Sequence, residues 1–385
     1  MDKFIIHGGN KLRGEIKVSG AKNVAMKIIL AGLLTNEPIF VKNVPLISSV
    51  YGTAEFVKHL GVDVEISDNH CVKIKGEHIH SFTLPLELGG VYRTAPMVIG
   101  PLLARFGSAV VPNPGGCRIG KRPIDRHISG LRALGAKIVY KDGFFYAHTQ
   151  GLKGTKYTFE SNSHTGTETM LLAAVLATGE TILENAAEEP EVDDLIRLLN
   201  NMGAKVKRLK RRTIVIEGVK KLKGTEFEVM PDRNEVVTFA IGAIATGGDV
   251  IIEGTQREHL GAFLSKLSQA KANWEAISQN KTRFWGSKNL KAADVTTEIH
   301  PGFMTDWQAP WTLLMTQAKG ESRVHETIYE DRFGYVGQLR KMGAHIEFFH
   351  PKVKNPGKFY NFNWSDKIKN NFQAINITGP TKLHN

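Results

Sequence analysis

Cys117 is the side chain whose surroundings offer the most chemistry. It lies in the segment 112–127, where three glycines and three prolines predict a shaped loop rather than a helix or a strand. Arg118, Lys121 and Arg122 flank it, and positive neighbours stabilise a thiolate and make the sulfur more reactive. A lone cysteine is more commonly a small buried hydrophobe. That is our interpretation of Cys71, which lies in an alternating segment, whereas for Cys117 we predict a reactive thiol.

Several motifs, in chain order, carry a resemblance to a known family. The loop Pro114-Gly115-Gly116-Cys117-x-Ile119-Gly120-x-Arg122-Pro123 resembles the catalytic loop of the enolpyruvyl transferases of peptidoglycan synthesis. The segment 19–23, Ser-Gly-Ala-Lys-Asn, resembles their N-terminal substrate motif. Further matches lie at 100–107, 184–191, 231–233, 305–309 and 326–333. The resemblance spans the chain, and its cysteine loop argues against the shikimate-pathway transferase, which shares the fold and the chemistry but lacks that loop.

The resemblance implies transfer of an enolpyruvyl group from phosphoenolpyruvate to the 3-hydroxyl of UDP-N-acetylglucosamine, with release of phosphate. Cys117 would be the general acid that protonates the methylene carbon of phosphoenolpyruvate. Asp306 would face the sugar hydroxyl as a base or orienting group, although an aspartate at a helix start is more often an N-cap. The thiol of Cys117 can also add to the carbon next to that methylene. By the same resemblance, the protein would be inactivated by fosfomycin.

A substrate with a phosphate and a carboxylate needs converging cations and helix N-termini. Lys22, Arg93 and Arg122 match the family's cations, and the first two stand where apolar helices are predicted to open. Each alone would be taken for a solvated surface charge; their equivalent positions favour a binding role. By the same resemblance the remaining substrate residues are Asn23, Pro123, Ile124, Asp125, Arg126, Thr165, Gly166, Ile328 and Arg332. The segment 164–168 departs from the family's usual form.

A repeat of about 70 residues must position these side chains. One phrase, a helix end followed by Gly-Ala and a strand start, recurs with its turn residue at Gly61, Gly135, Gly203, Lys271 and Gly343. Glycine suits this turn because a helix C-terminus commonly needs a left-handed residue, so Lys271 predicts local strain. Apolar helices open in phase with the turns, near residues 22, 93, 166, 233 and 306. Helices that are apolar all round are buried.

The fold class expected from this repeat and from the resemblance is α/β, a two-domain inside-out α/β barrel. Residues 1–20 with 231–385 would form a discontinuous catalytic domain, and residues 21–230 the domain that carries the Cys117 loop. Five helix pairs of an expected six are complete. We therefore expect that the C-terminus lacks the last repeat, which in the family supplies two further motifs; a rearranged final repeat is the alternative. An N-terminal strand at 3–7 would belong with that repeat.

Composition supports a globular protein and limits the alternatives. The length of 385 residues favours two domains, with 42% hydrophobic and 23% charged residues. Two cysteines indicate a reducing compartment, and the cytoplasm is our expectation. Neither a membrane span nor a secretory signal is visible. The scattered histidines predict no metal site, and we expect no cofactor.

The formal charge of +12 suits either nucleic acid or small anionic substrates. The run 207–212 precedes an apparent strand at 213–217, so we interpret it as a solvated hairpin and expect no nucleic-acid partner.

The oligomeric state is left open. The competing hypotheses are a shikimate-pathway transferase and a non-catalytic paralogue that binds the UDP-sugar. Thermal protection by UDP-N-acetylglucosamine, set against a shift on a nucleic-acid gel, separates an enzyme from a basic binding protein.

Overall fold

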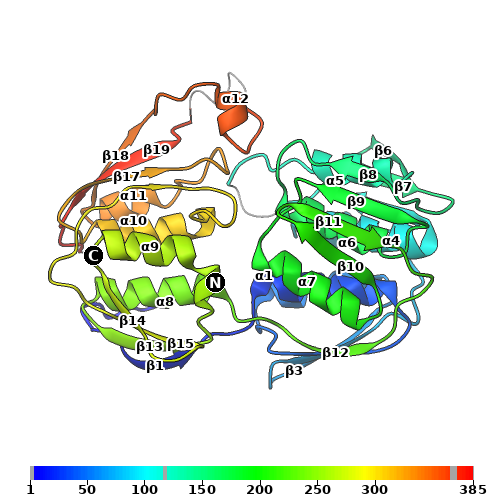
Figure 1. The fold of residues 1–385 in the computed structure, drawn as a ribbon, viewed down its shortest axis with the longest axis horizontal. Helices are drawn as coiled ribbons and strands as arrows, with labels where there is room; N and C mark the ends of the chain where they lie inside the picture. The colour runs from blue at the N-terminus through cyan, green and yellow to red at the C-terminus, as the bar shows by residue number, and fades with distance from the viewer. Residues whose placement is uncertain (1–3, 116–118, 365–370, 385) are drawn as a thin grey trace. The chain divides into compact units, whose positions relative to one another are not determined.

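The computed structural model of the chain describes residues 4–115, 119–364 and 371–384 (Figure 1). Within these ranges, no helix is both long enough and apolar enough to cross a membrane. Cys117 lies outside the described residues.

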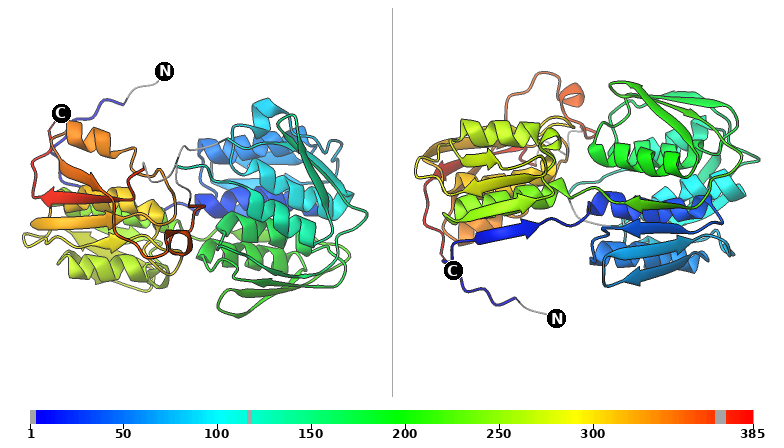
Figure 2. Two further views of the ribbon diagram at one scale, coloured as in Figure 1. Left: turned by 90° about the horizontal axis from the view of Figure 1, so that it is seen from above. Right: turned by 60° about the horizontal axis from the view of Figure 1, so that its bottom comes forward.

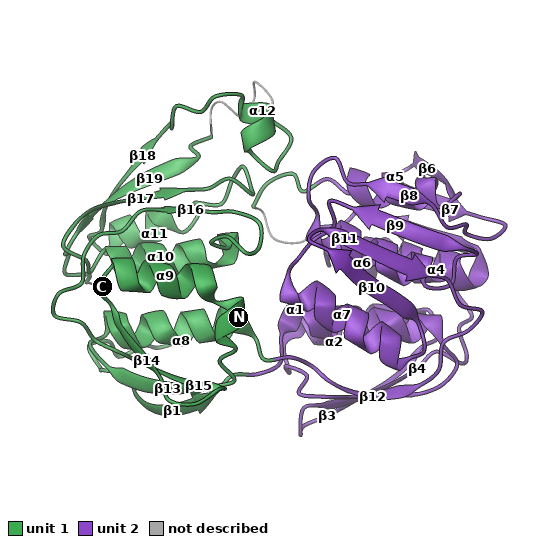
Figure 3. Ribbon diagram, in the orientation of Figure 1, with its two compact units in different colours: residues 1–18, 118–122, 231–385 green, residues 19–117, 123–230 purple. Residues whose placement is uncertain are grey.

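Contacts divide the chain into two compact units (Figure 3). Unit 1 contains residues 1–18, 118–122 and 231–385, and unit 2 contains residues 19–117 and 123–230. We predicted that all of 21–230 belongs to one domain. The short segment 119–122, however, makes its contacts with unit 1.

In unit 2 the helices lie at the centre and the sheets cover them (Figure 1). The buried helix α6, His164–Ala174, shows why: every residue from Gly166 to Ala174 is buried. The helices are α1 (Lys22–Ala31), η1 (Gly32–Leu34), α2 (Ser48–His59), α3 (Leu86–Gly89), η2 (Ala95–Val98), α4 (Ile99–Phe106), α5 (Asp125–Ala133), α6 and α7 (Pro190–Asn201). The strands are β2 (Ile39–Lys42), β3 (Asp63–Ser67), β4 (Cys71–Lys75), β5 (Ser108–Pro112), β6 (Lys137–Lys141), β7 (Phe144–His148), β8 (Lys156–Thr158), β9 (Glu180–Glu184), β10 (Lys205–Lys210), β11 (Thr213–Glu217) and β12 (Thr225–Glu228).

Unit 1 repeats the arrangement, with its helices between two sheets (Figures 1 and 2). Trp307 and Trp311, both fully buried, pack with Phe263 and Phe303 in its core. The helices are α8 (Arg233–Ala245), η3 (Arg257–His259), α9 (Gly261–Gln269), η4 (Thr305–Trp307), α10 (Gln308–Met315), α11 (Val336–Lys341) and α12 (Pro356–Phe359). The strands are β1 (Arg13–Lys17), β13 (Asp249–Glu253), β14 (Asn273–Ala276), β15 (Lys281–Trp285), β16 (Val295–Thr296), β17 (Gly320–His325), β18 (His345–Phe349) and β19 (Ala374–Gly379).

The sheets share one plan, which is the structural form of the repeat. In β12-β2-β4-β3, β8-β9-β11-β10, β1-β13-β15-β14 and β16-β17-β19-β18, the first two strands are parallel and the rest antiparallel. The sheet β5-β7-β6 has three named strands, and a parallel bridge from Thr83 to Val110 stands in for the fourth. The fold class predicted from the sequence, an inside-out α/β barrel with five helix pairs, is confirmed in the described residues.

The turn between each amphipathic helix and the following strand is left-handed, as predicted. The backbone φ is +99° at Gly61, +96° at Gly135, +98° at Gly203 and +95° at Gly343. Lys271 adopts the same region with φ 54°, where a residue with a Cβ is strained. The repeat therefore fixes the turn even where its sequence no longer favours it.

The prediction of an N-terminal strand at 3–7 is wrong. None of the described residues 4–12 belongs to a strand, and the first strand is β1, which pairs in parallel with β13. Phe4, Ile5 and Ile6 are 97%, 85% and 84% exposed. The apolar residues at 4–6 indicate that this segment could be buried in a sheet. They do not indicate whether a partner strand is present.

Candidate active site

The start of α1 carries the first two predicted substrate residues in unit 2. Ala21 is the N-cap, without a side-chain hydrogen bond, and its own N–H donates to the carbonyl of Met230 (2.7 Å). Lys22 is exposed and Asn23 half-buried. A positive side chain therefore stands beside helical N–H groups that no N-cap side chain binds, an arrangement that favours anions.

Arg93 and the segment 123–126 lie together in the same unit. The guanidinium Nη2 of Arg93 donates to the carbonyl of Pro123 (3.4 Å). Ile124 is buried and is the N-cap of α5, so it anchors the segment, while Asp125 is exposed in the first turn. Arg126 is half-buried. Local structure thus brings five of the predicted residues to one end of α5.

The first turn of α6 holds Thr165 and Gly166. The Ser163 hydroxyl caps the helix by accepting from the N–H of Gly166 (3.1 Å). The hydroxyl of Thr165 lies 3.0 Å from Nε2 of His127, whose Nδ1 lies 2.8 Å from the hydroxyl of Thr169.

His127 was not predicted, although it follows directly on Arg126. Burial, with smaller contributions from the positive charges of Arg93 and Arg126, lowers its pKa to about 3. The ring is therefore neutral, and it joins α5 to α6 through two hydroxyls.

In unit 1, Arg122, Asp306 and Arg332 gather around Tyr329. The guanidinium of Arg122 lies 5.6 Å from the centre of the Tyr329 ring, and that of Arg332 lies 5.5 Å from it. Arg332 also forms an ion pair with Asp306, whose side chain is 39% exposed. Burial raises the pKa of the Tyr329 hydroxyl. The pair directs the Asp306 carboxylate while leaving part of it open to a ligand.

The segment 119–122, which follows Cys117, is held by the same part of unit 1. The N–H of Lys121 donates to Oε1 of Glu330 (2.8 Å), and the N–H of Asp331 donates to the carbonyl of Ile119 (3.2 Å). Arg122 has a left-handed φ of 46°. These bonds fix the described end of the cysteine loop.

Glu326 connects the segments of unit 1 that carry Asp306 and Ile328, a role that was not predicted for it. Its carboxylate is almost fully buried and accepts from the Thr305 hydroxyl (2.8 Å) and the Gln308 amide (3.0 Å). It also accepts from the N–H groups of Ile328 (2.8 Å) and Tyr329 (3.0 Å). One side chain therefore holds the residue before Asp306 to the loop that contains Ile328.

The chain is similar to known proteins over most of its length. The model of the EPSP synthase (3-phosphoshikimate 1-carboxyvinyltransferase) family matches residues 6–364. The UDP-N-acetylglucosamine 1-carboxyvinyltransferase of Acidobacterium capsulatum is 42% identical over 350 residues, which cover 90% of this chain and 80% of the relative. That of Idiomarina loihiensis is 44% identical over 354 residues, covering 90% and 83%. This chain belongs to the UDP-N-acetylglucosamine 1-carboxyvinyltransferase family.

Solved structures support the fold of this UDP-N-acetylglucosamine 1-carboxyvinyltransferase family member. The enolpyruvyl transferase NikO from Streptomyces tendae has a TM-score of 0.83 at 19% identity, covering 99% of this chain and 85% of that one. EPSP synthase from Acinetobacter baumannii has a TM-score of 0.68 at 21% identity, covering 98% and 84%. At such identities the likeness concerns the fold alone.

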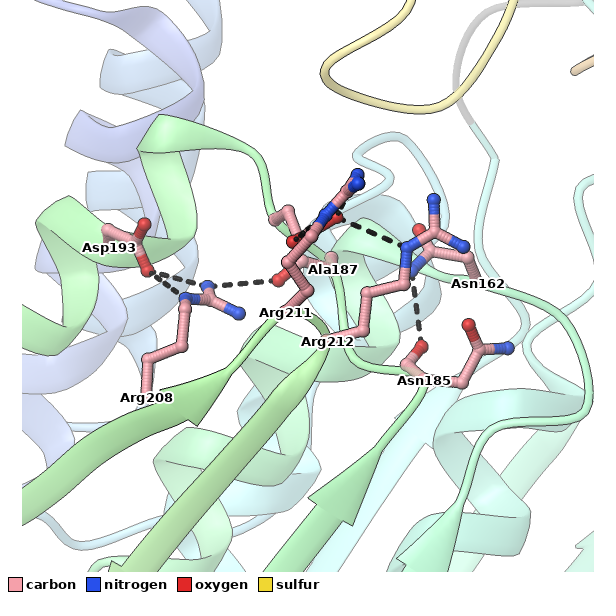
Figure 4. Close-up of polar contacts among 8 residues, drawn as sticks. Asn162, Asn185, Ala187, Asp193, Arg208, Arg211 and Arg212 are labelled. Carbon is pink, nitrogen blue, oxygen red and sulfur yellow. Dashed lines mark hydrogen bonds and ion pairs between the residues drawn. The ribbon is translucent and has the colours of Figure 1, made fainter.

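The basic run of this family member forms the predicted hairpin, β10 and β11, but it is not wholly solvated (Figure 4). Arg208, only 21% exposed, binds Asp193 (2.5 Å). Arg211 and Arg212 both bind Glu188, at 3.1 and 3.2 Å. The arginines therefore hold the chain that leads into α7, and the sequence pattern alone could not show these partners.

No group of three or more potential metal ligands occurs in the part of the chain that the structure describes. The predicted site residues are divided between the units. Unit 2 holds Lys22, Asn23, Arg93, Pro123, Ile124, Asp125, Arg126, Thr165 and Gly166, and unit 1 holds Arg122, Asp306, Ile328 and Arg332.

Proposed function

We propose that this chain transfers the enolpyruvyl group of phosphoenolpyruvate to the 3-hydroxyl of UDP-N-acetylglucosamine and releases phosphate. The observation that carries this is the 42–44% identity, over 90% of the chain, to proteins named for that reaction. The product would enter peptidoglycan synthesis, and with it cell-wall growth, cell shape and division. With two cysteines in the chain, we place the reaction in the cytoplasm.

The chemistry is an addition followed by an elimination. The Cys117 thiol gives its proton to the methylene carbon of phosphoenolpyruvate, and positive charge develops on the adjacent carbon. The sugar 3-hydroxyl adds to that carbon and its proton passes to Asp306. The Cys117 thiolate then takes a proton back from the new methyl group, and phosphate departs with the proton that Asp306 had taken. This restores the double bond, now attached to the sugar oxygen. The same Cys117 sulfur can add to this substrate, and it would also be the nucleophile that fosfomycin alkylates.

The other site residues bind and orient. Lys22, Arg93 and Arg122 would hold the phosphate and carboxylate of phosphoenolpyruvate. Asn23, Thr165, Gly166 and Ile328 would contact the sugar nucleotide, with Pro123, Ile124, Asp125 and Arg126 beside the uridine. The ion pair with Arg332 supports this role for Asp306, because it limits the carboxylate to few orientations.

Phosphate release from phosphoenolpyruvate tests the proposal. We expect release only when UDP-N-acetylglucosamine is also present. The Cys117→Ala variant should lose at least about 100-fold in rate, as expected for removal of a general acid. The matched control is Cys71→Ala, since Cys71 lies in β4, and it should keep the wild-type rate.

The outcomes separate the alternatives. Release without the sugar nucleotide, or at the wild-type rate in Cys117→Ala, would contradict the proposed mechanism. No release combined with thermal protection by UDP-N-acetylglucosamine would indicate a paralogue that only binds the sugar nucleotide.

A further inference from the structure

Two buried charges in unit 2 take no part in the proposed mechanism. Lys27 lies on α1, whose other buried residues are apolar, and Glu168 lies on α6 between the buried Thr167 and Thr169. Their side chains are 3% and 0% exposed, and Nζ of Lys27 lies 3.3 Å from Oε2 of Glu168. Lysine and glutamate are almost never buried this fully unless they are paired.

His164 completes the group, which we name the buried triad: Lys27, Glu168 and His164. Nε2 of His164 lies 3.2 Å from Oε1 of Glu168, one helical turn along α6. Nε2 of His164 and both carboxylate oxygens of Glu168 lack a partner in hydrogen-bond geometry among the described residues. Charge rather than directed hydrogen bonding therefore holds the triad together.

The surrounding charges favour a protonated His164. Burial by itself lowers the pKa of the imidazole, but the contact and charge of Glu168, together with the charge of Glu189, raise it above its ordinary value. Glu189 is the N-cap of α7, and one of its buried oxygens has no hydrogen-bond partner among the described residues. With His164 charged, two cations face two carboxylates.

The triad links α1 and α6, two of the helices whose starts carry predicted substrate residues. Lys27 is on the same helix as Lys22 and Asn23, and Glu168 follows Gly166 by two residues. Helix α1 packs mainly against α2 and α7, and the long Lys27 side chain adds an ion pair to α6. A buried ion pair is a poor source of stability, because well-packed apolar side chains often replace it without loss. Its presence here fits a geometric role better.

We infer that the buried triad positions the sugar-nucleotide site, by locking the first turn of α6 onto α1. The inference rests on the proposed function, and it makes Lys27, Glu168 and His164 positioning residues that do not touch the substrate. Loss of the triad should weaken binding of UDP-N-acetylglucosamine and leave the chemical step unchanged once the site is filled. In kinetic terms KM rises and kcat does not fall.

The decisive variant is Lys27→Met with Glu168→Met, which removes both charges at once and leaves neither unpaired. We expect the Kd and KM for UDP-N-acetylglucosamine to rise at least about tenfold, with kcat within about twofold of wild type and KM for phosphoenolpyruvate unchanged. The matched control is Lys205→Met with Glu217→Met, which removes an exposed pair from the same unit, 59% and 61% exposed. It should bind like wild type. The conservative Lys27→Arg keeps the charge and should stay within about threefold in KM.

Calorimetric binding to wild type comes first and separates the two failures. If wild type does not bind UDP-N-acetylglucosamine, the proposed function fails and takes this inference with it. If wild type and the double variant bind equally, or the control loses as much affinity as the double variant, the inference alone is overturned. Should the double variant not fold, His164→Gln decides, since it changes one side chain that is 22% exposed and leaves Lys27 and Glu168 paired. A rise in Kd of about threefold or more supports the inference, and a wild-type Kd overturns it.

Discussion

Glu326 in unit 1 and Glu168 in unit 2 are both buried carboxylates beside predicted substrate residues, yet they are held in different ways. Glu326 accepts four hydrogen bonds, two of them from backbone N–H groups. Glu168 lies between two cations and is in hydrogen-bond geometry with no described residue. A carboxylate held by the backbone is built into its loop, whereas one held by side-chain charges can be removed together with its partners.

The largest effect should come from Glu326→Leu. Four donors lose their acceptor, and each buried donor left unsatisfied costs about 1–3 kcal/mol. We expect the free energy of unfolding to fall by at least about 4 kcal/mol, measured by chemical denaturation. The control is Glu321→Leu, an exposed position on β17, which should change it little. A loss below about 1 kcal/mol for Glu326→Leu would show that these bonds do not organise the loop.

Next in size is Lys27→Met alone. It leaves Glu168 buried beside a single partner, and breaking a buried pair costs about 3–5 kcal/mol. The double variant with Glu168→Met should recover most of this loss and unfold within about 1.5 kcal/mol of wild type. Equal stabilities of the single and double variants would mean that the two charges are not coupled.

A matching double variant at Glu326 tests whether its charge can also be removed together with a partner. Thr305→Val combined with Glu326→Gln removes one donor and the charge but leaves the N–H groups of Ile328 and Tyr329 in place. The Gln amide cannot accept from all the remaining donors, so we expect a loss of about 2 kcal/mol that no side-chain partner can restore. A free energy of unfolding equal to that of wild type would show that Glu326, like Glu168, can be replaced together with a side-chain partner.

The smallest effect should be a pH dependence of unit 2. The folded pKa of His164 is raised above the value of about 6.5 for an unfolded chain. Its contribution is therefore full below about pH 6.5 and is lost as the pH rises through the folded pKa. Thermal melts of wild type and His164→Gln should differ by about 1 kcal/mol or less at pH 6 and converge at higher pH. A stability difference between the two proteins that grows with pH would contradict a protonated His164 in the triad.

His127, on α5 and in contact with the first turn of α6, should act in the opposite sense and serves as the internal comparison. Its pKa is lowered to about 3, so the unfolded chain takes up the proton first as the pH falls. Stability should then decrease below about pH 6.5 in wild type and less so in His127→Gln.

The sequence predicts the repeat well because its signals are local. The strand at 213–217 and the left-handed turns follow from periodicity and from glycine chemistry within a few residues. The site is predicted only as far as motifs reach. Lys27 and Glu168 are each an odd charge on an apolar helix, which was a usable signal, but the pattern cannot say that they meet. Glu326 was noted in a motif, while its four donors depend on the path of the loop in space.

Mass spectrometry of the sugar nucleotide, after incubation of the protein with phosphoenolpyruvate and UDP-N-acetylglucosamine, detects the proposed product itself. We expect UDP-N-acetylglucosamine to gain one enolpyruvyl group for each phosphate released. An unchanged UDP-N-acetylglucosamine in the presence of both bound substrates would contradict it.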